Sequence, residues 1–149
     1  MILVTGASRG LGKAIFDELG KTHKTIGLAT REDKKKNIYE CDISNYNSVK
    51  KAARFIKKLD SKLFALINVA GVASMNLTVA MPETKIRNII DTNLLGTIFV
   101  NQAFAPFLIR NGYGRIINFS TLAVRLAIKG EAVYIASKAG VEAFSRSLP

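Results

Sequence analysis

Apolar runs alternate with amphipathic segments along the chain, a pattern typical of a parallel sheet covered by helices. The apolar runs predict five strands, over residues 2–4, 25–29, 37–41, 64–68 and 115–119. The segments between them predict four helices, over residues 10–21, 46–59, 83–110 and 131–148. We therefore expect an α/β fold, built as a single domain over residues 1–149 around a Rossmann-like, doubly wound parallel sheet.

Three details refine this pattern. Residues 30–36 are too short for a normal crossover helix, so a parallel connection there must be unusually tight. In the segment 46–59 apolar residues recur at helical spacing and lysines fill the other face, with Ser44 or Asn45 as the N-cap. No strand follows the last predicted helix, so the strand over 115–119 would lack an outer neighbour.

Composition narrows the class of protein. Apolar residues make up 48% of the chain, which is enough for a sizeable core. The opening residues carry no basic leader or cleavage site, which favours a cytoplasmic protein, and Cys41 has no second cysteine for a disulfide. The longest charge-free run, residues 63–82, contains polar residues, so we expect no membrane span. We expect no metal site.

The formal net charge of +11 is concentrated in lysine clusters of the first part of the chain, at residues 34–36, 50–51 and 57–58. Such clusters could attract nucleic acid, a phosphate-bearing cofactor or an acidic protein partner. For each cluster, a solvated helix face or a charged loop is the favoured explanation. Because no nucleic-acid-binding motif accompanies them and aromatics are not interleaved with these lysines, we expect no nucleic acid partner.

A glycine-punctuated turn, Thr-Gly-Ala-Ser-Arg-Gly-Leu-Gly over residues 5–12, follows the first predicted strand and opens the first predicted helix. Glycines let backbone N–H groups approach a pyrophosphate closely, and the helix N-terminus adds a favourable dipole. A tight turn with no ligand could use the same glycines. Its position at the start of an alternating α/β pattern favours dinucleotide binding.

The choice of dinucleotide depends on the residues just after the second strand, where a carboxylate would hold the ribose diol of NAD. Ala29 stands at that position, and Arg9 and Arg31 could pair with a 2'-phosphate, so NADP(H) is favoured over NAD(H). Glu32 and Asp33 are close enough in sequence to bind a diol instead. Past the third strand, Asp42 either accepts a hydrogen bond from the adenine amine or serves as the N-cap of the next helix.

Tyr134 and Lys138 lie four positions apart on the last predicted helix, so they share one face. A tyrosine with its ordinary pKa of about 10 is a poor acid at neutral pH. A neighbouring ammonium group stabilises the phenolate and brings proton transfer within reach. Spacing alone would not carry this hypothesis, because the pair could equally be two residues on an amphipathic helix.

Together these residues resemble the short-chain dehydrogenase/reductase family, most closely its NADP-dependent beta-ketoacyl carrier protein reductases. Four further segments share the resemblance: Asn-x-Ala-Gly at 68–71, Asn93 within 92–96, Gly-Arg-Ile-Ile-Asn at 114–118, and Tyr134 to Gly140. The resemblance implies the strand order 3-2-1-4-5. It also implies NADP(H)-dependent interconversion of a carbonyl and a secondary alcohol on a small-molecule or carrier-bound substrate.

The resemblance also implies roles for individual residues. Tyr134 would protonate the carbonyl oxygen, and Lys138 would bind the nicotinamide ribose and tune the tyrosine. Thr121 stands at the position of the family serine that binds the substrate oxygen and retains its hydroxyl, and Asn93 would position the lysine through water. The residues implied in cofactor binding are Gly6, Ser8, Arg9, Gly10, Leu11, Gly12, Thr30, Arg31, Asp42, Ile43, Asn68, Ala70, Gly71, Tyr134 and Lys138.

The chain also departs from the family. Val69 replaces an asparagine of the family motif, and Val124 stands where glycine often follows the catalytic hydroxyl. The C-terminal strands and the substrate-covering segment of the family are missing, so a second hypothesis is a non-catalytic dinucleotide-binding or scaffold subunit. By resemblance, we expect a homodimer or homotetramer that pairs the helices over 83–110 and 131–148.

Overall fold

The computed structural model describes residues 1–59 and 62–148, which fold around one parallel sheet. Its strands, in the spatial order β3-β2-β1-β4-β5, are β1 (Ile2–Thr5), β2 (Thr25–Ala29), β3 (Ile38–Glu40), β4 (Ala65–Asn68) and β5 (Arg115–Asn118). The order and the parallel pairing confirm the predicted doubly wound sheet. Each strand begins and ends within one residue of its predicted bounds.

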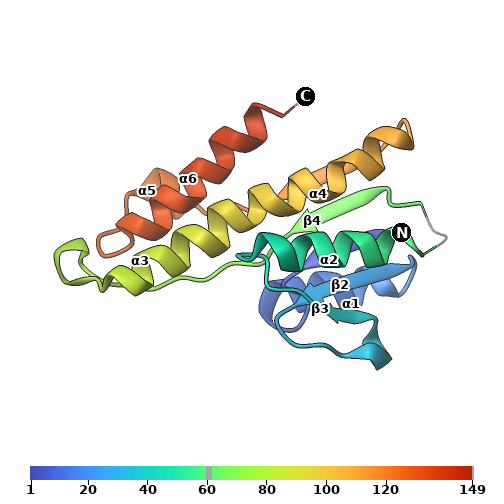
Figure 1. Ribbon diagram of the computed structural model, residues 1–149. Helices are drawn as coiled ribbons and strands as arrows, with labels where there is room; N and C mark the ends of the chain where they lie inside the picture. The colour runs from blue at the N-terminus through green and yellow to red at the C-terminus, as the bar shows by residue number, and fades with distance from the viewer. Residues whose placement is uncertain (60–61, 149) are drawn as a thin grey trace.

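Helices connect the strands and cover the sheet (Figure 1). The long ones are α1 (Gly10–Gly20), α2 (Tyr46–Lys57), α3 (Glu83–Ile90), α4 (Gly96–Arg110) and α6 (Ala132–Arg146). Two short helices, η2 (Thr78–Ala80) and α5 (Ala123–Leu126), were not predicted, because three or four residues show no readable periodicity. The tight connection predicted after β2 is confirmed, since it holds only the single 3₁₀ turn η1 (Lys34–Lys36).

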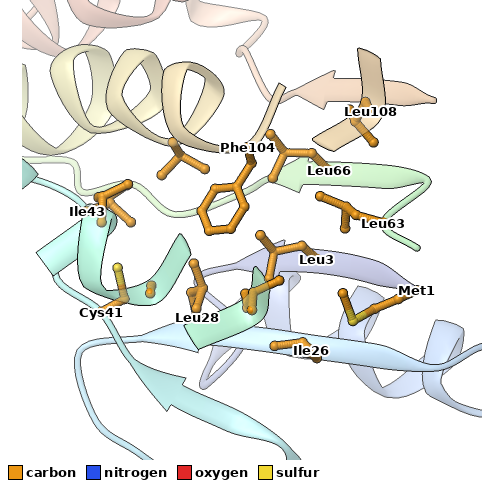
Figure 2. Close-up of a cluster of buried hydrophobic side chains, with 14 residues drawn as sticks. Met1, Leu3, Ile26, Leu28, Cys41, Ile43, Leu63, Leu66, Phe104 and Leu108 are labelled. Carbon is orange, nitrogen blue, oxygen red and sulfur yellow. The ribbon is translucent and has the colours of Figure 1, made fainter. Parts of the chain in front are cut away.

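The sheet separates two hydrophobic clusters, because successive side chains along a strand point to opposite faces. On one face, Leu3 and Leu66 pack with buried residues of α2 and α4, and the Phe104 ring of α4 points into the centre of the cluster (Figure 2). On the other face, Val4 and Ile67 pack against Phe16 of α1. Burial on both faces explains why these strands are continuous apolar runs.

The helix predicted over residues 83–110 is interrupted by a π-helical segment, η3 (Asp91–Leu95), between α3 and α4. A π turn adds one residue to the helical repeat and shifts the face that each following residue presents. Here it coincides with Asn93, whose side chain is fully buried. The prediction of one uninterrupted helix is therefore wrong at this point, although α3 and α4 run in almost the same direction on either side of η3 (Figure 1).

Among the described residues, Glu83–Arg110 is the one helix long and apolar enough, by length and composition alone, to cross a membrane. This is weak support for a membrane span, because core helices of soluble proteins pass the same test. Val100 and Phe104 are fully buried in the core, and Asn93 and Asn101 are buried polar residues with hydrogen-bond partners. Packing against the sheet therefore accounts for the apolar residues on the buried face of this helix.

Strand β5 forms one edge of the sheet, since β4 is its only partner among the described strands. Alternate residues of β5 are exposed, and the Ile117 side chain retains 47% of its accessible surface. An unpaired edge of this kind presents free backbone N–H and C=O groups for pairing with another chain. The predicted lack of an outer neighbour for this strand therefore holds within the part of the chain that the structure describes.

Candidate functional site

A cleft of about 590 Å³ lies at the carboxyl ends of the strands, where doubly wound sheets bind their ligands. It extends from the turn after β1 to one face of α6. Residues from across the sequence line it: Gly6, Ser8, Arg9, Gly10, Leu11, Gly12, Leu28, Ala29, Thr30, Cys41, Asp42, Ile43, Ser44, Val69, Ala70, Gly71, Val72, Ala73, Asn88, Thr92, Phe119, Ser120, Tyr134 and Lys138.

The turn from β1 into α1 forms one end of the cleft. Gly6 and Gly10 have φ angles of +71° and +56°, a conformation that other residues rarely adopt. At Gly12 there is no room for a side chain, because a Cβ atom would lie 2.3 Å from the carbonyl oxygen of Gly6. The backbone of the turn can therefore fold closely on itself only with glycine at these positions.

The N-terminus of α1 faces this cleft without a side-chain cap. Arg9 occupies the N-cap position, and its side chain makes no capping hydrogen bond to the helix. The first turn of α1 contains no acidic residue. Uncapped N–H groups and the positive end of the helix dipole form a site suited to an anionic group. A pyrophosphate fits this end of the cleft by charge and by the close approach that the glycines allow.

Thr5 joins the turn to the neighbouring strand. Its buried hydroxyl oxygen accepts hydrogen bonds from the backbone N–H groups of Val69 and Ala70, both at 3.1 Å. A Cβ atom on Gly6 would lie 2.9 Å from Cα of Ala70, so the two loops are in direct contact. The hydroxyl of Thr5 thereby holds the β1 and β4 ends of the cleft together.

The residues after β2 and β3 form the second part of the cleft. Thr30, Asp42 and Ile43 line it, whereas Arg31 is exposed and does not. The Asp42 carboxylate accepts hydrogen bonds from the backbone N–H of Ser44 at 3.0 Å and from its hydroxyl at 2.7 Å. The alternative of Asp42 as the helix cap is wrong. Asn45 is the N-cap of α2, accepting from two backbone N–H groups.

Helix α6 brings Tyr134 and Lys138 to the other end of the cleft. Both side chains line it, one helical turn apart. The ammonium group of Lys138 donates a hydrogen bond of 2.8 Å to the carbonyl oxygen of Phe119, the residue after β5. Lys138 is only 5% exposed, and this burial lowers its pKa below the ordinary 10.5. The bond to Phe119 fixes the ammonium group at the point where β5 meets α6.

Asn93 lies behind the cleft wall and does not line it. Its amide accepts a hydrogen bond from the backbone N–H of Val72 and donates to the carbonyl of Val72, each at 2.8 Å. It also donates to the Ser137 hydroxyl at 3.0 Å. A Cβ atom on Gly71 would lie 3.2 Å from Oδ1 of Asn93 and 3.6 Å from Nζ of Lys138. Asn93 thus connects the loop after β4 to the helix that carries Tyr134 and Lys138.

Two adjacent hydroxyl groups follow β5, and they differ in position. Thr121 does not line the cleft, and its hydroxyl oxygen accepts from the backbone N–H of Ala123 at 3.2 Å, at the start of α5. Ser120 does line the cleft, and its hydroxyl donates to Glu142 at 2.6 Å. The resemblance places the hydroxyl that binds the substrate oxygen at Thr121, thirteen residues before Tyr134, and not at Ser120. The position of Ser120, two residues after a strand that ends at the cleft, is the sequence signal for a second candidate.

Thirteen of the predicted site residues therefore line one cleft: Gly6, Ser8, Arg9, Gly10, Leu11, Gly12, Thr30, Asp42, Ile43, Ala70, Gly71, Tyr134 and Lys138. Arg31, Asn68, Asn93 and Thr121 do not line it. Asn68 is buried at the end of β4, where its amide donates to Asn118 at 2.8 Å. No group of three or more His, Cys, Asp or Glu side chains that could hold a metal occurs among residues 1–59 and 62–148.

The buried charge of Lys138 predicts a pH-dependent stability difference. The amino group of Lys138 binds its proton more tightly in the unfolded chain than in the folded one. The folded state is therefore destabilised by the full amount below the lowered pKa, and this destabilisation disappears as the pH rises to about 10.5. A Lys138→Met variant lacks the buried charge. Its free energy of unfolding minus that of the wild type should therefore fall as pH rises toward 10.5, in urea titrations at a series of pH values. A difference independent of pH would contradict the assignment.

The family model described as short chain dehydrogenase matches residues 1–149. Among curated proteins, the chain is 32% identical to the 3-oxoacyl-[acyl-carrier-protein] reductase FabG of Salmonella typhimurium, covering 98% of this chain and 64% of the relative. It is 31% identical to the 2-dehydro-3-deoxy-L-rhamnonate dehydrogenase (NAD(+)) of a Sphingomonas strain, covering 98% of this chain and 63% of the relative. The chain thus spans just under two thirds of the length of these relatives.

Two solved structures resemble the fold closely. The ligand-free aldohexose dehydrogenase of Thermoplasma acidophilum superimposes with a TM-score of 0.91 at 31% identity, over 98% of this chain and 58% of that one. A metagenomic short-chain oxidoreductase in complex with NADP superimposes with a TM-score of 0.89 at 29% identity, over 98% of this chain and 73% of that one. With the family model matched from the first residue to the last, this chain belongs to the short-chain dehydrogenase/reductase family.

Proposed function

We propose that the protein is an NADP(H)-dependent oxidoreductase that interconverts a carbonyl group and a secondary alcohol, with Tyr134 as its acid/base. One observation carries the proposal: a single cleft joins the uncapped N-terminus of α1 to Tyr134 and Lys138. A ligand that spans this cleft would have an anionic group at one end and its reacting atoms at the other. A dinucleotide has this form.

The chain offers separate groups for each part of such a ligand. The turn with Gly6, Gly10 and Gly12 would receive the pyrophosphate at the start of α1. Arg9 at the cleft surface, with Thr30 and Arg31 after β2, would receive the 2'-phosphate of NADP(H). The likeness to a short-chain oxidoreductase in complex with NADP supports this preference, although a relative named as an NAD(+) enzyme also matches.

Two residues of α6, Tyr134 and Lys138, would carry out the proton transfer. NADPH supplies the hydride when it is bound. The phenol of Tyr134 would donate a proton to the carbonyl oxygen, and the Lys138 ammonium, held by Phe119, would stabilise the phenolate left behind. Thr121 or Ser120 would donate a further hydrogen bond to the same oxygen. Asn93 would fix the position of Lys138 relative to the loop after β4, because it bonds to Val72 of that loop and to Ser137 beside the lysine.

The proposed substrate is a small-molecule or carrier-bound carbonyl compound, by likeness to the acyl-carrier-protein reductases. We further propose a cytoplasmic homodimer or homotetramer that pairs the helices over 83–110 and 131–148. The exposed side chains of Leu95 and Ile109 on the first of these segments support an apolar interface there. Sedimentation at increasing protein concentration would test this assembly. A protein that remains monomeric at every concentration would contradict it.

The test of the proposed function is NADPH oxidation measured against a panel of ketones and 3-oxoacyl thioesters. Because the relatives are longer, both this chain and the longest product of its reading frame should be assayed. Turnover with at least one carbonyl class is the expected result. Tight NADPH binding without turnover in either form would instead support the second hypothesis, a dinucleotide-binding subunit without catalysis. Absence of dinucleotide binding would contradict both.

Arg9 should discriminate between the two dinucleotides. It lies at the cleft surface, and an arginine can bind a phosphate with two charge-assisted hydrogen bonds. Arg9→Ser should therefore weaken NADPH binding about tenfold, the order expected for a lost charged hydrogen bond, and leave NADH binding nearly unchanged. Fluorescence titration with both nucleotides measures the ratio. Arg31→Ser tests the second cation proposed for the 2'-phosphate and should have a smaller effect in the same direction, because Arg31 does not line the cleft. Equal losses for NADPH and NADH would contradict a 2'-phosphate role.

A further inference from the structure

Helix α2 carries an unbalanced positive charge on its outer face. Five cations lie within and just after it, namely Lys50, Lys51, Arg54, Lys57 and Lys58, and the helix contains no acidic residue. Three other helices each pair one cation internally at i,i+4 spacing: Lys13 with Asp17 in α1, Arg87 with Glu83 in α3, and Arg146 with Glu142 in α6. Among the described residues, none of the five cations of α2 has a carboxylate within ion-pair distance.

The five cations form one compact stripe. At about 100° per residue they fall within an arc of about 120°, opposite the buried Val49, Ala52 and Ile56. Eight residue steps at about 1.5 Å give the stripe a length of roughly 12 Å. We call this set, together with the partly exposed aromatics Tyr46 and Phe55 on its two flanks, the α2 cationic face. Figure 1 shows α2 on the outside of the molecule.

This arrangement is unfavourable for the isolated helix. Lys50 and Arg54, and Arg54 and Lys58, are like-charge pairs at i,i+4 spacing, each of which destabilises a helix by about 0.2–0.5 kcal/mol. Cations in the last turn are favoured by the helix dipole, which accounts for Lys57 and Lys58. The dipole does not account for Lys50 and Lys51, which lie in the first half of the helix. A bound row of carboxylates would relieve this repulsion.

The aromatics beside the stripe already make ring contacts within the protein. The Tyr46 ring lies between Phe99, with ring centroids 5.2 Å apart, and the ammonium of Lys50, 4.7 Å from its centroid. The Phe55 ring packs on Tyr39 at 4.5 Å. Single-stranded nucleic acids bind proteins through aromatic faces that bases can cover. The α2 cationic face has flanking hydrophobic contact area and a row of charges, which suits an acidic protein segment better.

We propose that the α2 cationic face is a docking site for an acidic helical segment of a partner protein. Glutamates or aspartates on one side of the partner helix, spaced at i, i+3 or i+4 and i+7, would span about 10.5 Å and so match most of the length of the cationic stripe. The flanks at Tyr46 and Phe55 would contact the edges of the partner helix. The face is distinct from the cleft, since none of its cations lines the cleft.

The test measures binding of a labelled helical peptide with glutamates along one side, and of its glutamine counterpart, by fluorescence anisotropy at several salt concentrations. Binding of the glutamate peptide should be saturable and weaken with salt, and the glutamine peptide should bind at least tenfold more weakly. The triple variant Lys50→Glu, Lys51→Glu, Arg54→Glu should lose roughly tenfold or more in affinity. The milder triple glutamine variant should lose less, in the same direction.

The matched control reverses the same number of charges in η1, as Lys34→Glu, Lys35→Glu, Lys36→Glu. It should change peptide affinity by less than about twofold, because it alters net charge equally without touching α2. Thermal unfolding temperatures close to that of the wild type in both triple variants would show that they fold. Equal losses in the two variants, equal binding of both peptides, or no saturable binding would overturn the proposal. So would tighter binding of polyuridylate RNA or phosphatidylserine vesicles that the α2 variant abolishes.

Discussion

Replacing Tyr134 by phenylalanine is expected to lower kcat for carbonyl reduction about 1,000-fold and to leave NADPH affinity within about twofold of the wild type. A positioned general acid contributes roughly 10² to 10⁴ to the rate, and phenylalanine keeps the ring while removing the proton. The side chain is half-buried on α6, so the ring continues to fill its place in the cleft wall. Steady-state rates and nucleotide titrations on the same preparations give both quantities.

Tyr113→Phe is the matched control for this experiment. Tyr113 lies before β5 outside the cleft, and it packs against the guanidinium of Arg115. Removing its hydroxyl should leave kcat unchanged within about twofold, since the group does not contact the cleft. A Tyr134→Phe enzyme that turns over at the wild-type rate would contradict the assignment of Tyr134 as acid/base. The two variants should be compared in whichever form shows turnover, this chain or the longest product of its reading frame.

Gly12→Ala should abolish measurable dinucleotide binding, with affinity reduced at least about 100-fold. An alanine Cβ would lie 2.3 Å from the carbonyl oxygen and 2.8 Å from the carbonyl carbon of Gly6. Both contacts are with backbone, so the turn itself must move. The moved turn would no longer present its N–H groups to a pyrophosphate at the start of α1. The overpacking should also destabilise the fold by about 1–3 kcal/mol.

Gly20→Ala places the same methyl group at the far end of α1. There a Cβ atom would meet only the Thr25 hydroxyl, at 3.2 Å, and the position lies outside the cleft. Nucleotide affinity should stay within about twofold, and thermal unfolding of the two variants separates folding from binding. If Gly12→Ala bound NADPH as tightly as Gly20→Ala, the turn would not be the pyrophosphate site.

Most of the sheet could be predicted because its strands are buried on both faces and appear as short apolar runs. The interruption of the 83–110 helix could not, since a π turn leaves the apolar content of the segment unchanged. The short α5 could not be predicted either, because its start involves a local hydrogen bond from the backbone N–H of Ala123 to the hydroxyl oxygen of Thr121. These features depend on which polar groups meet in three dimensions.

The residues of the candidate site also fall into those whose position could be predicted from the sequence and those whose position could not. Residues in motifs with a geometric requirement, such as the glycines of the first turn and the pair Tyr134 and Lys138, line the cleft. The hydroxyl after β5 was harder to place, because Ser120 and Thr121 are chemically equivalent in sequence and differ only in the direction that the chain takes into α5. Asn93 is buried behind the wall for a similar reason, since its partners Val72 and Ser137 are distant in sequence.

The most direct test of the cleft as a dinucleotide site is a titration of the isotope-labelled chain with NADPH, followed through backbone amide chemical shifts. The predicted result is saturable binding, with the largest shifts in Gly6, Gly10 and Gly12 of the first turn, in Asp42 and Ile43, and around Lys138. Lines from α2 should move little, because its cations lie outside the cleft. Absence of saturable binding, or shifts confined to regions away from the first turn and α6, would contradict a dinucleotide site in this cleft.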